Sequence, residues 1–310
     1  MIISVLVPTY RRTQDLARCL EALKKQLRPV DEVIVVVRDS DEETLQFFRD
    51  YQHQPLPLKT ATVSVTGVIA AMNEGLGVAQ GDVIALTDDD AAPPPDWIGR
   101  IEAYILSDER IGGVGGRDII AGFEGAKTDV GILRWWGRVS GNHHIGVGAP
   151  REVDVLKGVN CAYRAAPLRK IGFDTRMRGE GAQVHWELSL GLALKREGWK
   201  LIYDPSLTVD HVTAQRHDKD QRVFSSAAHL DIVHNETLVL LDHFIWPQRV
   251  VFLIWAVIVG SGGVPGGLQF LRLMARRDSK ALQKFRASFS GRMAGLRSFL
   301  NESKGRKRLQ

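Results

Sequence analysis

Cysteine is scarce in this chain of 310 residues, which contains only Cys19 and Cys161. The two lie far apart, and neither stands in a CxxC pair or at a metal-ligand spacing, which argues against a disulfide framework or a cysteine-based metal centre. The N-terminus lacks both a basic segment before its apolar run and a small-residue cleavage site, so it does not have the pattern of a signal peptide. Such a composition fits a reducing cytoplasm.

The chain also lacks the glycine-rich fingerprint of dinucleotide-binding enzymes. Its first apolar run, residues 2–7, is followed by Pro8-Thr9-Tyr10-Arg11-Arg12 and not by G-x-G-x-x-G. The glycine cluster at 112–116 comes too late and precedes no helical pattern. A nicotinamide-dependent dehydrogenase is therefore disfavoured.

What is present is a regular alternation of apolar runs and helical periodicity. The runs are largely apolar at successive positions, which indicates strands buried on both faces of a parallel sheet. An alternating α/β pattern of this kind places ligands at the carboxyl ends of its strands. Strands are predicted at residues 2–7, 33–37, 60–65 and 83–86, and helices at 15–27, 42–51 and 68–79.

The predicted strand at 83–86 runs directly into Asp88, Asp89 and Asp90. Carboxylates at the end of a buried strand need a positive partner, because burying an unpaired charge is costly. A hard divalent cation takes oxygen ligands, and Mg²⁺ binds through one or two carboxylates together with substrate phosphates. The triplet therefore indicates either a metal–diphosphate site or a polar turn closed by residues 91–95.

The segment after this strand has weaker patterns. Residues 97–106 and 186–197 have helical spacing, whereas 118–147 has no clear periodicity. A long irregular segment inside a compact domain is typical of a functional loop. Its Trp135 and Trp136 would either be core residues or stack on a sugar.

Taken in order, the motifs of the chain resemble those of the family 2 glycosyltransferases. The resemblance covers about residues 2–212 and rests on the ordered set, since a lone D-x-D is common. It implies the GT-A fold, an α/β fold with a Rossmann-like mixed sheet and helices on both faces. The motifs are Val7-Pro8-Thr9-Tyr10, Asn73-Glu74-Gly75-Leu76, Asp88-Asp89-Asp90, Gly158-Val159-Asn160, Trp186-Glu187 before a leucine-rich helix, and Val209-Asp210-His211.

The resemblance also implies roles for single residues. Asp90 and His211 match ligands of Mn²⁺ or Mg²⁺, which neutralises a diphosphate leaving group. Glu187 matches the general base that takes the proton of the acceptor hydroxyl. The family usually has Glu-Asp where this chain has Trp186-Glu187, and Glu180 is the rival base. The nucleotide side is matched by Pro8, Thr9, Tyr10, Arg12, Arg38, Asn73 and, toward the ribose, Asp88; the acceptor side is matched by Gly158, Asn160 and Trp186.

Arg38 departs from the family pattern. Many members have Asp-Asp-Gly-Ser after the second strand, where this chain has Val37-Arg38-Asp39-Ser40. An aspartate that commonly reads the uracil is thus replaced by Arg38. We therefore expect donors other than UDP-sugars to be favoured.

The C-terminal region is first apolar and then basic. Between Arg249 and Arg272 lie 22 uncharged residues, a length that could span a bilayer, but glycines crowd their second half. We expect 250–271 to be a re-entrant or surface-lying helical pair; a soluble core hairpin and a true span stay open. Residues 272–310 carry twelve Lys and Arg against two Asp and Glu, and within them 279–300 is predicted to be a basic amphipathic helix.

Such a helix lies in anionic membrane interfaces, and its alternative is an ordinary helix packed on the catalytic domain. Its predicted apolar face consists of Leu282, Phe285, Phe289, Met293, Leu296 and Leu300. No nucleic-acid partner is expected, because the chain has no motif that reads bases.

We therefore predict a GT-A catalytic domain at 1–215 and a helical, membrane-associating region at 216–310. The predicted activity is metal-dependent, inverting transfer of a sugar from a nucleotide-diphosphate donor to a hydroxyl of a lipid-linked or polysaccharide acceptor. The predicted place is the cytoplasmic face of the inner membrane, as a peripheral or monotopic protein. Two alternatives stay open: a nucleotidyltransferase, which should have a more basic first loop, and a catalytically silent membrane scaffold.

Overall fold

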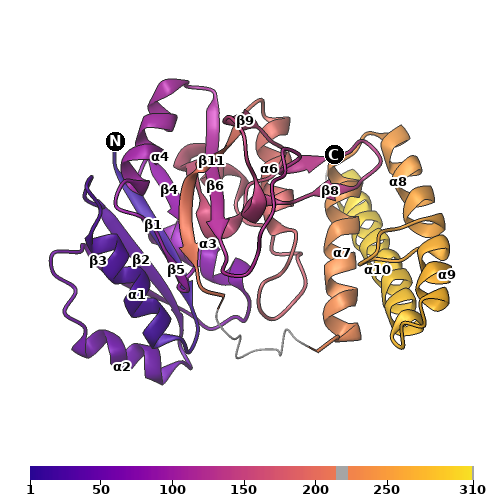
Figure 1. Ribbon diagram of the computed structural model, residues 1–310, viewed down its shortest axis with the longest axis horizontal. Helices are drawn as coiled ribbons and strands as arrows, with labels where there is room; N and C mark the ends of the chain where they lie inside the picture. The colour runs from indigo at the N-terminus through magenta and orange to yellow at the C-terminus, as the bar shows by residue number, and fades with distance from the viewer. Residues whose placement is uncertain (214–222, 309–310) are drawn as a thin grey trace.

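The computed structural model describes residues 1–213 and 223–308 (Figure 1). Its first part is the predicted alternation of strands and helices. The strands β1 (Ile3–Thr9), β2 (Glu32–Arg38), β3 (Leu58–Val63) and β4 (Val83–Leu86) are parallel neighbours. The helices between them are α1 (Thr13–Lys24), α2 (Glu42–Asp50) and α3 (Val68–Val78).

These strands belong to a mixed sheet of nine strands, in the order β3-β2-β1-β4-β10-β6-β11-β5, with β9 also pairing to β11. The strand β10 runs antiparallel to both β4 and β6, so β6 has the same direction as β4. The strand β11 is parallel to β6, whereas β5 and β9 are antiparallel to β11. Six strands, β1, β2, β3, β4, β6 and β11, therefore run the same way, and their carboxyl ends lie at one edge of the sheet. The later strands are β5 (Ala91–Ala92), β6 (Ile111–Ile119), β9 (Arg151–Glu152), β10 (Cys161–Arg164) and β11 (Lys200–His211).

The glycine cluster at 112–116 is the middle of the buried strand β6, which the sequence did not predict. Its glycines make room for neighbours: a Cβ on Gly113 would lie 2.6 Å from the Tyr163 ring, and one on Gly116 only 1.7 Å from the Leu207 carbonyl oxygen. Glycine is thus required here for close approach of the neighbouring strands and not for a turn.

Residues Lys200–His211 form one long strand, β11. Its pairing with β6 shifts register between Asp204 and Thr208, where Pro205 lies. A proline fits inside a strand at such an irregularity because its missing N–H leaves no gap in the ladder. The shift lets one strand reach from the core to His211.

The irregular segment at 118–147 contains only short elements. The strands β7 (Ile132–Leu133) and β8 (Val139–Ser140) form a small hairpin, and η1 (His143–Ile145) follows it. Trp135 at the hairpin is 56% exposed and meets Trp136 edge to face. The other elements of this part are α4 (Trp97–Ser107), the 3₁₀ helix η2 (Gly158–Asn160), α5 (Ala165–Ile171) and α6 (Trp186–Arg196).

Four helices, α7 (Ser226–His243), α8 (Trp246–Ile258), α9 (Gly267–Ala275) and α10 (Ala281–Arg308), lie together at one end of the molecule, opposite β3 and α2 (Figure 1). Residues 250–271 fall in α8, α9 and the turn between them, and Pro247 lies in the first turn of α8. Among the described residues, no helix combines the length and apolarity needed to cross a membrane.

The C-terminal helices are part of one apolar cluster with the sheet. Leu238 and Phe252 belong to the same cluster of buried side chains as Leu6 and Ile34. The predicted domain boundary between 215 and 216 lies outside the described residues.

Candidate active site

A cavity of about 360 Å³ opens at the sheet edge where the co-directional strands end. Ligands of open α/β sheets bind at such an edge, because the loops that follow the strands diverge there. Most of the side chains predicted from the sequence line it together: Pro8, Thr9, Tyr10, Arg12, Arg38, Asp88, Asp90, Gly158, Trp186, Glu187 and His211.

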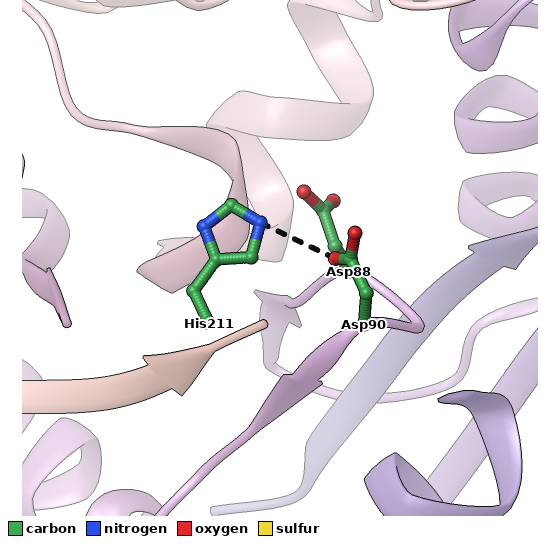
Figure 2. Close-up of side chains that lie close together, drawn as sticks. All are labelled: Asp88, Asp90 and His211. Atoms are coloured by element: carbon green, nitrogen blue, oxygen red, sulfur yellow. Dashed lines mark ion pairs between the residues drawn. The ribbon is translucent and has the colours of Figure 1, made fainter. Parts of the chain in front are cut away.

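Asp88 and Asp90 come from the loop after β4, and His211 is the last residue of β11 (Figure 2). One ligand atom from each lies within 4.8 Å of the others. The Nε2 atom of His211 is 3.3 Å from an Asp90 carboxylate oxygen. The three residues are 123 positions apart in the sequence at most and meet only because β4 and β11 end at the same edge.

Asp118 contacts His211, and Lys157 contacts Asp118 in turn. The Nδ1 atom of His211 lies 3.4 Å from Asp118 Oδ2, and Lys157 donates to the same oxygen over 2.7 Å. Burial lowers the pKa of His211, but the hydrogen bonds with Asp118 and Asp90 outweigh it and raise this pKa to about 9. A carboxylate on the far nitrogen of a ligand histidine fixes its ring orientation and increases its basicity.

The chemistry of this donor set fits a divalent cation. Two carboxylates and an imidazole would supply up to three ligands and leave positions for water and substrate oxygens, as Mg²⁺ and Mn²⁺ sites require. The carboxylates of Asp118 and Asp90 raise the pKa of His211. A bound divalent cation would replace the imidazole proton on the side of Asp90. Asp88, Asp90 and His211 are therefore the residues that would hold Mn²⁺ or Mg²⁺.

Asp89, between the two candidate ligands, has a structural role. It is buried, accepts a hydrogen bond of 2.7 Å from Thr9 Oγ1 and forms an ion pair of 2.7 Å with Arg12. Arg12 also reaches Asp90 over 3.1 Å. The guanidinium thus ties the loop after β1 to the acidic loop and neutralises part of its charge.

The end of the cavity at β1 and β2 is built for a flat, polar group. The Arg38 guanidinium lies 4.2 Å from the centroid of the Tyr10 ring. Apolar side chains, among them Val36, Val63 and Val68, complete this end. An aromatic ring, a planar cation and branched aliphatic side chains together suit a nucleobase.

Glu187 lies in the first turn of α6 and lines the cavity. Burial raises its pKa from the ordinary 4.5 to about 6. Gly158 permits this arrangement, because a Cβ there would lie 2.4 Å from the Trp186 indole and 3.5 Å from a Glu187 carboxylate oxygen. A carboxylate with such a pKa is ionised at neutral pH yet basic enough to accept a proton.

The rival base, Glu180, lines the same cavity from the loop between α5 and α6. This loop is held by Asn235 of α7, whose Oδ1 accepts from the Arg178 amide over 2.8 Å. Its Nδ2 donates to the carbonyl oxygens of Arg178 and Val184 over 2.9 and 3.0 Å. A single buried amide from the C-terminal region thus fixes both ends of the segment 178–184.

Two predicted site residues lie outside the cavity lining. Asn73 exchanges hydrogen bonds of 2.9 and 3.0 Å with the backbone of Phe173, so it joins α3 to the loop after α5. Asn160 is fully buried, accepts from Trp97 Nε1 over 2.8 Å and donates to the Leu207 carbonyl over 2.8 Å. Their amide groups are thus engaged in holding the fold, and their contacts with nucleotide and acceptor stay predictions.

Asp118, Lys157 and Asn235 are parts of the site that sequence reasoning missed. Asp118 stands at the end of an apolar, glycine-rich run, so recognising β6 would have placed it at the ligand edge beside Asp88 and Asp90. Asn235 carries no such signal, because an isolated asparagine on a helix has many possible roles.

The sequence model of the family described as Glycosyl transferase family 2 matches residues 4–172, more than half of the chain. The chain belongs to this family. A curated relative, the glucosyl-dolichyl phosphate glucuronosyltransferase of Haloferax volcanii, is 25% identical over 73% of this chain and 74% of its own length. The chain spans less than two fifths of the length of other curated relatives that it matches.

Solved structures of glycosyltransferases have the same GT-A fold. S. aureus TarS 1–349 in complex with UDP-GlcNAc has a TM-score of 0.58 at 15% identity, over 100% of this chain and 93% of that one. The mannosyltransferase PcManGT from Pyrobaculum calidifontis in complex with GDP-Man and Mn²⁺ has a TM-score of 0.56 at 16% identity, over 96% and 86% of the two chains. The predicted family and fold are thus confirmed.

Proposed function

We propose that the chain transfers a sugar from a nucleotide-diphosphate donor to a hydroxyl of a lipid-linked or polysaccharide acceptor, with inversion and with Mn²⁺ or Mg²⁺. The observation that carries this proposal is that Asp88, Asp90 and His211 share one cavity with Glu187. Family membership supports the same reaction class. The Mn²⁺ named for the mannosyltransferase complex supports the choice of metal.

The donor would bind with its base at Tyr10 and Arg38 and its diphosphate at the acidic loop. When bound, the divalent cation would neutralise the negative charge of the diphosphate and so make it a better leaving group. Arg12 pairs with Asp89 and also reaches Asp90, while Asp88 and Asp90 line the cavity as the carboxylates of the proposed metal set.

Glu187 would perform the proton transfer. The acceptor oxygen forms a bond to the anomeric carbon while the bond from that carbon to the diphosphate oxygen breaks, and the electron pair leaves with the nucleoside diphosphate. The acceptor proton passes to Glu187, whose pKa of about 6 keeps it ionised at neutral pH. A single displacement needs no nucleophile from the protein, and it inverts the configuration.

The choice of acceptor is supported by a relative. The Haloferax volcanii protein is named as acting on glucosyl-dolichyl phosphate, a lipid-linked sugar. On the acceptor side of the cavity, Trp186 offers an aromatic face beside Glu187, and such faces stack on sugar rings.

The test is a donor screen with the purified chain of 310 residues, nucleotide sugars of different bases and Mn²⁺. We expect nucleoside diphosphate to be released from at least one donor, and this release to be lost with EDTA. Release of pyrophosphate from a nucleoside triphosphate would instead establish the nucleotidyltransferase alternative. A chain that binds no nucleotide in the presence of metal would be the silent scaffold.

A further inference from the structure

The last helix, α10, packs on α7 through small residues and through the buried Arg292, which pairs with Glu236 of α7 over 2.7 Å. Ala287 and Ser288 are buried, and Cβ atoms built on Gly291 and Gly295 would lie 2.7 Å from carbonyl oxygens of α7. Such close approach leaves no room for the large apolar side chains on this face of the helix. The large side chains of the predicted amphipathic face therefore lie elsewhere: Leu282, Phe289, Met293 and Leu300 are 37–53% exposed.

The helices α8 and α9 cover another side of α10. Phe270 of α9 stacks on Phe285 of α10 with ring centroids 4.6 Å apart, and Arg249 of α8 lies 4.9 Å from the Phe299 ring. Both helices lie at the outer edge of the molecule, away from the sheet (Figure 1). The side of each helix that does not contact α10 therefore faces outward.

This outer face is apolar. Six of its side chains, all between 50% and 62% exposed, define what we call the α8–α9 surface: Ile254, Val257, Ile258, Leu268, Leu271 and Met274. Within the described residues, no other element buries them. The three residues on each helix recur at helical spacing, so they share one face of it, and large exposed apolar faces often mark a binding surface.

The charges beside the α8–α9 surface are almost all positive. Arg272, Arg276, Arg277 and Lys280 are exposed on and after α9. Between residues 244 and 301 the sequence has one acidic residue, Asp278, and it pairs with Lys284 over 2.6 Å. The four exposed cations are thus available to an anionic partner.

We infer that the α8–α9 surface docks on an anionic lipid bilayer. Its apolar side chains would enter the boundary between headgroups and acyl chains, and the arginines of α9 would meet lipid phosphates. A second copy of the chain fits less well, because a two-fold contact would bring the same arginine clusters of two copies together. The inference rests on this surface alone and does not depend on the proposed sugar transfer.

The experiment is co-sedimentation of the full chain with vesicles of phosphatidylcholine alone or mixed with phosphatidylglycerol. The wild type should bind the mixed vesicles, bind the neutral ones more weakly, and lose affinity as salt is added. The double substitution Arg276→Gln/Arg277→Gln should weaken binding to the mixed vesicles about 30-fold, since each basic residue contributes about fivefold at an anionic surface. Ile254→Asp/Leu271→Asp should weaken binding to both vesicle types by about tenfold or more.

Matched controls lie on the far side of the molecule. Leu106→Asp changes a side chain that is 70% exposed on α4, and Arg110→Gln removes a similarly exposed charge; neither should alter binding. Absence of binding to mixed vesicles, or binding unchanged in both double variants, would overturn the inference. So would a concentration-dependent dimer that Ile254→Asp/Leu271→Asp abolishes in a chain that binds no vesicles, because the surface would then join two copies.

Discussion

Replacing Glu187 by Gln should make the protein less active and more stable at the same time. The substitution keeps the shape of the side chain and removes the carboxylate that would accept the acceptor proton. General base catalysis contributes about 10²–10⁴-fold, so kcat should fall by that order while the affinity for nucleoside diphosphate stays unchanged. An unchanged affinity for nucleoside diphosphate would show that the variant has lost its general base and not its nucleotide-binding site.

The gain in stability follows from the shifted pKa. Glu187 titrates at about 6 in the folded chain against an ordinary 4.5, because burial disfavours its charged form. The folded state thus binds this proton more tightly than the unfolded state does, and between these two pH values the stability falls as pH rises. Above about pH 6 the charged group costs at most about 2 kcal/mol, which Gln would recover.

The assay is urea unfolding of both proteins at pH 8 and at pH 4, together with turnover of the donor found in the screen. We expect the variant to be more stable by up to about 2 kcal/mol at pH 8 and equal to the wild type at pH 4. The activity of the wild type should also decline below about pH 6, as Glu187 takes up its proton.

Glu180→Gln is the matched control, because it removes a carboxylate from the same cavity. The control should keep most of its activity. A fully active Glu187→Gln protein beside an inactive Glu180→Gln protein would refute the reasoning and assign the base to Glu180. A destabilised Glu187→Gln protein at pH 8 would show that burial does not disfavour this charge.

Three other substitutions test the rest of the site. Asp118→Asn should weaken Mn²⁺ binding by about 10–100-fold in calorimetry, because Asp118 orients His211; unchanged affinity would remove it from the metal set. Asn235→Ala should speed proteolysis of the segment 178–184 and lower kcat, whereas exposed Asn301→Ala should do neither; equal protection in both would show that the clamp is dispensable. Arg38→Ala should raise the donor KM about 3–30-fold and change the preference among bases, and an unaltered order of donors would exclude Arg38 from base recognition.

The first half of the fold was predictable because its strands and helices follow simple patterns. Residues 83–86 are apolar throughout and end in acids, and the structure has this strand with these bounds. The strand β6 was not predictable in the same way, because four of its nine residues are glycine and its branched side chains do not alternate with polar ones. Only the large neighbours of those glycines, such as Tyr163, explain them, and these neighbours are distant in sequence.

In the candidate site too, the residues at strand ends were predictable, and those whose orientation depends on distant partners were not. Residues at or just after the end of a strand, such as Tyr10, Arg38, Asp88 and Asp90, line the cavity together, because the strand direction fixes where they lie. Asn160 lies in a motif of similar strength but faces inward. Whether an amide points to a cavity or to buried backbone depends on partners such as the Leu207 carbonyl, which no local pattern reveals.

The C-terminal helix shows a related limit. Its large apolar residues recur with helical spacing, which indicates a face for a membrane interface or for packing on the catalytic domain. The structure packs α10 on α7 through Gly291 and Gly295, because small residues let α7 approach closely. Periodicity thus identifies a face but not the neighbour that covers it.

The most direct test of the central claim is calorimetric titration of nucleoside diphosphates into the full chain with Mn²⁺, and again with EDTA. We expect at least one nucleoside diphosphate to bind with Mn²⁺ and EDTA to abolish this binding. Asp90→Ala should abolish it too, because Asp90 is one of the proposed metal ligands. Equal nucleotide binding with and without metal, or in the Asp90→Ala variant, would contradict it.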